Sequence, residues 1–209
     1  MINISIAGIG GQGSVLAAKI LAQAAQAKGW QVRTTETKGM AQRGGSVVSH
    51  IRMGNAGEVV YAPLPAKGSV DVLIALEPGE GARALPLLKA GGLLVVPVSG
   101  VAPIALETKN TSYKPKILID ELKEKGISVV VVDDLDICAR LNSRKSLNII
   151  MLVYALLAAN KRSDCENNAL RGNLSLDEVR EAIKVCVKSD FVKMNMKAID
   201  MTEKVYSND

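Results

Sequence analysis

The first residues that could bind a ligand are glycines that directly follow an apolar run, Ile2–Ala7. Their spacing is Gly-x-Gly-x-x-Gly, and from Ser14 onward the sequence has the alanine-rich pattern of a helix. Glycines in such a turn let the backbone approach a ligand closely, and N–H groups at a helix start carry a partial positive charge that suits phosphate or carboxylate. We therefore predict a cofactor-binding loop made of Gly8, Gly10, Gly11, Gln12 and Gly13. The alternative is a tight strand-to-helix turn that holds no ligand.

A second glycine segment, Lys38–Gly45, follows the next predicted strand. Its single arginine, Arg43, has a planar, permanently charged guanidinium that can hold a phosphate or carboxylate through two parallel hydrogen bonds. We predict that Arg43, Gly44 and Gly45 lie opposite the first loop and take part in the same anion site. For Arg43, a salt bridge at a subunit contact is the alternative.

The position of Glu36 is also compatible with a dinucleotide-binding site. It lies 23 residues after Gly13, near the position where dinucleotide-binding enzymes place the acid that holds the ribose. The pattern alone therefore also fits a stand-alone NAD(P)- or FAD-binding dehydrogenase domain. Such an enzyme needs a substrate domain with its own acid–base residue, and the sequence offers neither the length nor a candidate.

The remaining reactive side chains exclude several kinds of site. Three cysteines lie far apart without Cys-x-x-Cys spacing, which excludes an iron–sulfur cluster or zinc knuckle held by this chain alone. The one histidine, His50, lies in an apolar strand-like run, where a structural role is expected. A strand end followed by a helix N-cap explains Asp133, Asp134 and Asp136 better than a metal site does. We predict no catalytic and no metal-binding residue.

Charge is unevenly distributed along the chain. The formal net charge is +5, and residues 1–60 hold six basic against two acidic side chains, a net charge of +4. A basic excess beside glycine-rich loops favours an anionic ligand or an acidic partner surface, although a solvated basic face is the simpler alternative. Aromatic residues make up only 3% of the chain, which argues against a nucleic-acid-binding protein that stacks bases.

Alternating strands and helices must position the two loops. Ile2–Ala7, a helix from Ser14 to about Lys28 and the strand Gln31–Thr37 form a predicted β–α–β unit. Further strands are predicted at Ser46–Arg52, Glu58–Tyr61, Asp71–Leu76, Leu93–Val98 and Ile127–Asp133. Further helices are predicted at Pro78–Lys89 (ended by Gly91 and Gly92), Lys116–Lys125, Ser146–Ala159, Leu176–Lys188 (opened by the capping box Ser175-x-x-Glu178) and Phe191–Val205.

Several of these strands are apolar throughout, a pattern typical of a parallel sheet that is covered on both faces. We predict an α/β fold: a single doubly wound, mainly parallel, Rossmann-like sheet with a helical C-terminal part over about residues 146–209. No linker or internal repeat separates a second domain, so residues 1–209 are expected to form one domain.

Targeting and membrane signals are also missing from the sequence. The start, MINISIAGIG, lacks the basic residues and the apolar stretch of a signal peptide. The longest uncharged helix-like run, Ser146–Asn160, is too short to span a bilayer core of about 30 Å. We expect a cytoplasmic protein.

Two longer motifs resemble a known family. GIGGQGSVLAAKILAQAA and then TETKGMAQRGGSVVSHIR occur in order and at the family's spacing within residues 6–52. Together they resemble the γ subunits, or γ domains, of the 2-oxoacid:ferredoxin oxidoreductases, and most closely the small (β) subunits that act on indolepyruvate. The resemblance continues more loosely to about Leu157. In the family the segment after Asn148 often carries a glycine, whereas this chain has Val153 and Tyr154 there.

The resemblance implies an enzyme that oxidatively decarboxylates a 2-oxoacid to an acyl-coenzyme A. Thiamine diphosphate with magnesium and iron–sulfur clusters would do the chemistry and pass electrons to ferredoxin. The chain has no Gly-Asp-Gly…Asn signature for thiamine diphosphate and no cysteine set for a cluster, so these cofactors are expected in a large partner subunit. This chain alone is then inactive and firmly holds no cofactor of its own.

We therefore expect an accessory γ-type subunit whose loops 10–13 and 43–45 complete the interface near the thiamine site and help bind a phosphate of coenzyme A. Two other classes stay open: the stand-alone dehydrogenase domain, and a purely structural module whose glycines serve packing. The sequence does not decide which 2-oxoacid is used or the stoichiometry. An isolated chain could also form a homodimer through the surface meant for its partner.

Overall fold

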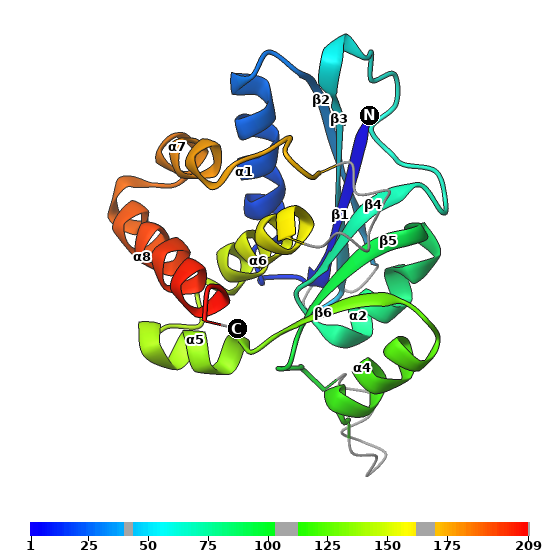
Figure 1. Cartoon of the computed structure of the whole chain (residues 1–209), viewed down its shortest axis with the longest axis vertical. Coiled ribbons are helices and arrows are strands. Elements are labelled where there is room, and N and C mark those ends of the chain that lie inside the picture. Colours follow the sequence, from blue (N-terminus) through cyan, green and yellow to red (C-terminus); the bar gives the residue numbers. More distant parts are fainter. Residues whose placement is uncertain (40–43, 103–112, 162–169, 209) are drawn as a thin grey trace.

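A six-stranded sheet in the order β2–β3–β1–β4–β5–β6 forms the centre of the computed structural model (Figure 1). The structure describes residues 1–39, 44–102, 113–161 and 170–208. The strands are β1 (Ile2–Ile9), β2 (Gln31–Lys38), β3 (Ser46–Gly54), β4 (Val70–Ala75), β5 (Leu88–Pro97) and β6 (Ser128–Val132).

The sheet is mixed. β1, β4, β5 and β6 pair in parallel, whereas β3 pairs antiparallel with both β1 and β2. The predicted α/β class is therefore confirmed, but the predicted β–α–β unit needs a refinement. β2 runs parallel to β1 without pairing with it, because β3 returns between the two strands.

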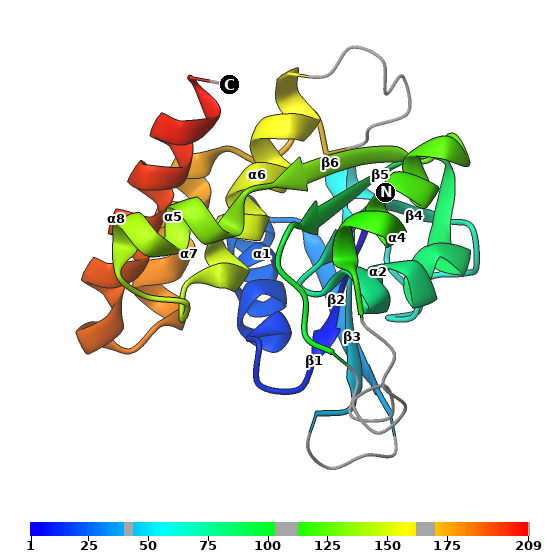
Figure 2. The same cartoon turned by 90° about the horizontal axis from the view of Figure 1, so that it is seen from below.

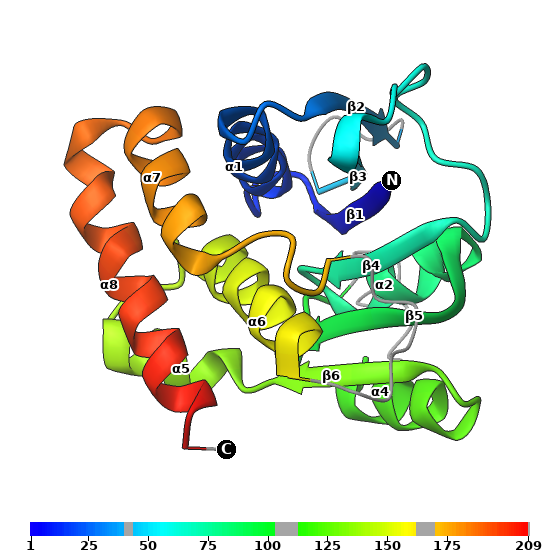
Figure 3. The same cartoon turned by 45° about the horizontal axis from the view of Figure 1, so that its top comes forward.

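Helices cover both faces of the sheet. They are α1 (Ser14–Ala27), α2 (Pro78–Ala84), α4 (Pro115–Glu124), α5 (Asp134–Leu141), α6 (Leu147–Lys161), α7 (Leu176–Cys186) and α8 (Ser189–Tyr206). Figure 2 shows α2 and α4 on one face, and α1 and α6 on the other. Outside α1 and α6 lies a further layer in which α7 packs on α1 and α8 on α6 (Figure 3).

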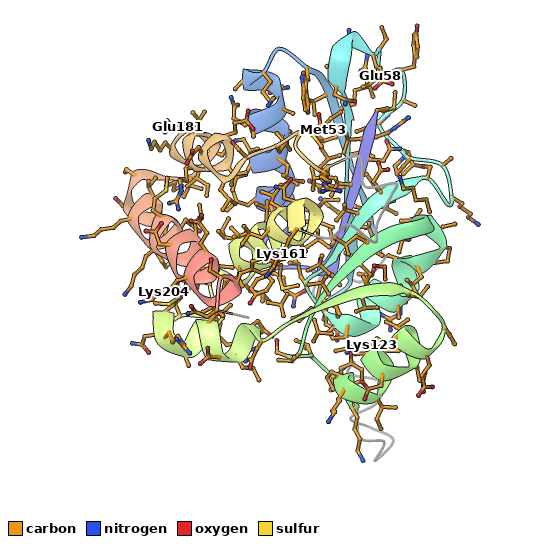
Figure 4. All side chains as sticks on the ribbon, viewed as in Figure 1. Met53, Glu58, Lys123, Lys161, Glu181 and Lys204 are labelled. Carbon is orange, nitrogen blue, oxygen red and sulfur yellow. The ribbon has the colours of Figure 1, made fainter. Side chains whose placement is uncertain are left out.

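Successive side chains of each strand point to opposite faces of the sheet, and an apolar core lies on each face. Ile4 and Ile6 of β1 face α1 and α6, while Leu73 and Ala75 of β4 belong to the core under α2 and α4. Helix α6 is buried almost all round because it lies between the sheet and α8. Charged side chains such as Glu181 and Lys204 point outward from the outer layer (Figure 4).

The predicted strand at Glu58–Tyr61 is wrong. After β3 the chain makes a short 3₁₀ turn at Asn55–Gly57 and then continues without regular structure. Side chains of β2 satisfy the backbone here, since Gln31 accepts from the N–H of Val60 at 3.2 Å and Arg33 donates to its carbonyl at 2.6 Å. The N–H and carbonyl of Val60 are therefore hydrogen-bonded although this segment does not join the sheet.

The predicted helix at Pro78–Lys89 is too long. α2 ends at Ala84, a 3₁₀ turn covers Leu85–Leu87, and β5 already begins at Leu88. The two glycines expected to end the helix lie inside β5 instead, where the register with β4 shifts and Gly91 adopts a φ of +70°. Glycine adopts this backbone at no steric cost, so the pair marks a strand irregularity rather than a helix end.

The predicted helix caps are confirmed. Ser175 and Glu178 form the reciprocal capping box of α7, and the Asp133 carboxylate accepts from the N–H of Asp136 at the start of α5. Of the helices in the described ranges, none combines the length and apolarity that crossing a membrane requires.

Candidate functional site

The two glycine loops meet at the edge of the sheet where the parallel strands end. Antiparallel pairing of β1 with β3 places Ile9 opposite Ser46, so the residues before β3 lie beside the loop after β1. The N–H of Gly10 donates to the carbonyl of Gly45 at 3.0 Å. Arg43, the cation predicted for this site, lies outside the described residues.

Gln12 turns inward and holds the first loop to the sheet. Its Oε1 accepts from the N–H of Ile9 at 2.7 Å, and its Nε2 donates to the carbonyl of Leu76 at 3.1 Å. Gly8 is buried beside it, and a Cβ on Gly8 would lie 2.8 Å from Gln12 Oε1. Both residues thus serve the shape of the loop.

Gly13 makes the transition from the loop into α1. It is the N-cap residue with a φ of +85°, no side chain caps the helix, and the first turn carries no acidic residue. Ser14 is 96% buried, and its hydroxyl has no hydrogen-bond partner among the described residues. The start of α1 therefore presents uncapped N–H groups and a hydroxyl beside the loop.

A cavity of about 840 Å³ opens in front of this helix start. It is lined by Gly10, Gly11, Gly13, Ser14, Val15, Leu16, Lys19, Lys38, Gly39, Gly45, Ser46, Val47 and Cys186. Two lysines and no carboxylate belong to the described lining. Lys38 pairs with Glu36 at 2.8 Å, whereas no acidic partner is found for Lys19 within the described ranges. Helix start, hydroxyl and cations together suit an anionic group.

Not all of the predicted site residues reach this cavity. Gly10, Gly11, Gly13 and Gly45 line it, while Gly8, Gln12 and Gly44 do not. Gln12 instead contributes to a smaller cavity of about 380 Å³ on the other side of the loop, which Arg144 and Lys145 also line.

Lys19, Lys38 and Ser14 were missed as site residues by sequence reasoning. A sequence signal for Lys19 did exist. Val15 lies in the first turn of α1 and lines the cavity, and Lys19 follows it by four residues, so both side chains lie on the same face of the helix. Lys38 ends β2, and only the antiparallel return of β3 brings it to the cavity.

Glu36 does not occupy the position of a ribose-binding acid. In a dinucleotide fold the strand that carries this acid neighbours the glycine-loop strand. Here β3 takes that place, and Glu36 lies one strand further out, opposite Ser49 and paired with Lys38. This geometry disfavours the dehydrogenase alternative.

His50 is buried and has hydrogen-bonding neighbours within the sheet, which fits the structural role expected for it. Its ring is 98% buried in β3, with Nδ1 2.9 Å from the hydroxyl of Ser5 and Nε2 3.3 Å from that of Thr37. Burial lowers the pKa of His50 below its ordinary value, because the charged ring would lose its hydration.

This lowered pKa predicts an acid-sensitive fold. Between the lowered value and about 6.5 the unfolded chain binds a proton at His50 that the folded chain does not, so the free energy of unfolding falls as pH drops through that window. One such group contributes a slope of at most about 1.4 kcal/mol per pH unit. Urea unfolding at pH 7.5 and pH 5.5 should show a smaller loss for His50→Gln than for the wild type. Equal losses would contradict this assignment.

The described residues hold no cluster of three or more histidine, cysteine, aspartate or glutamate side chains suited to a metal ion. Asp134, the most buried of the predicted acidic trio, accepts hydrogen bonds from the N–H of Ser99 at 3.0 Å and from its hydroxyl at 2.6 Å.

Cys138 is buried and Cys186 partly buried, and burial raises the pKa of both thiols. Cys165 lies outside the described residues.

Comparison with known proteins gives consistent matches over nearly the whole chain. The family model described as "Pyruvate ferredoxin/flavodoxin oxidoreductase" matches residues 3–204. The indolepyruvate oxidoreductase subunit IorB of Archaeoglobus fulgidus is 34% identical over 206 residues, which cover 96% of this chain and 92% of that subunit.

Solved structures share the fold. The γ subunit of a keto/oxoacid ferredoxin oxidoreductase from Geobacter sulfurreducens superposes with a TM-score of 0.66 at 23% identity, covering 99% of both chains. A 2-oxoglutarate:ferredoxin oxidoreductase from Magnetococcus marinus, solved with 2-oxoglutarate, coenzyme A and succinyl-CoA bound, gives a TM-score of 0.70 at 18% identity. That match covers 99% of this chain and 31% of the larger one.

Proposed function

Because this chain belongs to the pyruvate ferredoxin/flavodoxin oxidoreductase family and is a small subunit of a 2-oxoacid:ferredoxin oxidoreductase, we propose that its two glycine loops help bind coenzyme A at the interface with the catalytic subunit. The cavity in front of α1 is the observation that carries this proposal. It combines an uncapped helix start with Ser14, Lys19 and Lys38, all suited to a phosphate group.

Coenzyme A is the anionic ligand that fits this enzyme class best. Its nucleotide end carries phosphates, while its thiol must reach the acyl group formed on the partner subunit. The Magnetococcus enzyme, whose fold includes a unit like this chain, was solved with coenzyme A bound. A subunit that holds the phosphates and leaves the thiol free would fit this division of labour.

The other cofactors belong in the partner under this proposal. Thiamine diphosphate with magnesium and the iron–sulfur clusters would lie in the large catalytic subunit, which would pass electrons to ferredoxin. Residues 1–209 then act as one γ-type domain, since α6 and α8 of the C-terminal part pack together over the sheet that carries the loops. Indolepyruvate is the preferred 2-oxoacid, because the Archaeoglobus relative acts on it by name.

The assembly is tested first by recovery of the tagged full-length chain from its native cell extract. A brown complex with a large subunit that contains thiamine and iron is expected. A colourless chain recovered alone, from an extract shown to contain the intact large subunit, would contradict the proposal. Tight nicotinamide binding in a fluorescence titration would instead revive the dehydrogenase alternative.

Replacing Arg43 by alanine tests the second loop. If Arg43 holds a phosphate of coenzyme A, its loss removes a charge-assisted hydrogen bond, and KM for coenzyme A in the assembled enzyme should rise about tenfold. The exposed Arg171 offers a matched control, for which no change in KM is expected. If Arg43→Ala leaves both assembly and KM unchanged, Arg43 has no part in the site.

A further inference from the structure

One polar side chain interrupts the apolar start of helix α6. Asn148 is 96% buried, and the residues after it, from Ile149 to Leu156, are apolar apart from the Tyr154 hydroxyl and form part of the main core. The amide Nδ2 of Asn148 donates to the carbonyl of Gly13 at 3.2 Å, across 135 positions of sequence. Burying an amide is costly unless it is hydrogen-bonded, so this contact explains why a polar residue is tolerated here.

The carbonyl that Asn148 holds is also the first acceptor of helix α1. Gly13 O receives the N–H of Ala17 at 3.1 Å as well as the Asn148 amide. Any shift of this carbonyl therefore moves the first turn of α1 and the N–H groups that face the cavity.

Steric contact adds to the hydrogen bond. A Cβ on Gly13 would lie 2.7 Å from Nδ2 and 3.0 Å from Cγ of Asn148, so the side chain lies directly against the glycine backbone. Gln12 holds the preceding part of the loop to Leu76. The loop is thus fixed by one carboxamide from its own sequence and by another from α6.

We propose that Asn148 is a positioning residue, which holds the Gly13 carbonyl and thereby directs the start of α1 and the Ser14 hydroxyl toward the ligand cavity. It acts through Gly13 and touches no ligand itself. The identity of that ligand as coenzyme A rests on the proposed function, whereas the positioning of the loop does not.

Three variants of α6 separate positioning from simple stability. Asn148→Ala removes the hydrogen bond and the contact with Gly13, and Asn148→Ser is a milder form should the alanine variant fold poorly. Leu152→Ala is the control, because Leu152 is fully buried one turn further along the same helix. The leucine change should destabilise the chain at least as much, since it leaves a cavity in the core.

Amide hydrogen exchange of a peptide covering residues 9–16 in the full-length chain decides the proposal. We expect exchange there to be about tenfold faster in the Asn148 variants, since a lost hydrogen bond is worth about a factor of ten, and unchanged in Leu152→Ala. Wild-type exchange at residues 9–16 in both Asn148 variants would overturn it.

Kinetics of the assembled oxidoreductase then test the ligand separately. With a loosened helix start, KM for coenzyme A should rise about fivefold to tenfold while kcat stays within about twofold, because the chemistry belongs to the partner subunit. Faster exchange with an unchanged KM would leave Asn148 as the positioning residue and would contradict the assignment of coenzyme A to this cavity.

Discussion

Replacing Lys19 by glutamate is expected to raise KM for coenzyme A in the assembled oxidoreductase by about 100-fold, with kcat changed far less. Lys19 lies on the face of α1 that lines the cavity, and none of the described residues offers it an acidic partner. Its ammonium group is therefore free to meet an anionic ligand. Lys38, by contrast, already pairs with Glu36.

The size of this effect follows from two contributions. Lys19 is exposed, so its hydrogen bond to a charged group is expected to contribute about 1.5 kcal/mol, and Lys19→Met, which keeps the apolar stem, should raise KM about tenfold. Glutamate at the same place also repels the anionic ligand, and this repulsion accounts for the further rise in KM from about tenfold to about 100-fold. Because exposed charges are screened, the difference between the two variants should shrink as salt is added.

A charge reversal elsewhere provides the control. Lys123→Glu makes the same change in net charge on α4, which lies on the other face of the sheet from α1 (Figure 4). We expect its KM for coenzyme A to match the wild type. If Lys19→Glu assembles normally and also keeps the wild-type KM, the cavity in front of α1 does not bind coenzyme A.

Local patterns were enough to predict the first loop and its helix. Ile2–Ala7, the glycines and the alanine-rich run from Ser14 each carry a signal within a few residues, and the structure has β1 and α1 at these places. Ser46–Arg52 was likewise recognised as a strand. Its direction was not predicted, because antiparallel pairing with β1 depends on contacts between residues 37 to 51 positions apart in sequence.

The candidate site was harder to predict for the same reason. Glycines are visible in sequence, but whether each serves a ligand or packing depends on its neighbours in space. Gly8 lies against Gln12 and Leu76, and Gly13 against Asn148, whereas nothing lies within 4 Å of a Cβ placed on Gly11. The cations of the cavity come from a helix face and a strand end, and no motif links these two lysines.

Gly13→Ala is expected to lower the free energy of unfolding by about 3 kcal/mol. The left-handed backbone of Gly13 costs a residue with a Cβ about 1–2 kcal/mol, and forcing a methyl group against a packed neighbour costs about 1–3 kcal/mol more. Urea unfolding of the purified chain measures the loss. KM for coenzyme A in the assembled enzyme should rise as well, because the start of α1 must move.

Gly11→Ala is the matched comparison for this effect. Gly11 has a φ of +100°, so alanine strains the backbone there too, but its methyl group would point into open space. Backbone strain of this kind costs about 1–3 kcal/mol without a steric contribution. Because the clash with Asn148 adds to the strain, Gly13→Ala should be the more destabilising of the two.

A double-mutant cycle isolates the clash from the strain. In Gly13→Ala with Asn148→Ala, the methyl group no longer meets the carboxamide, so the double variant should be more stable than the two single effects predict by about 1 kcal/mol or more. The same cycle with Gly11→Ala should be additive, since Gly11 has no contact with Asn148 to lose. Additivity in both cycles would mean that the two residues are not coupled. Packing of the Asn148 side chain against the Gly13 backbone would then contribute nothing to the stability of the loop. Only the hydrogen bond to the Gly13 carbonyl would support the expected rise in KM for Asn148→Ala.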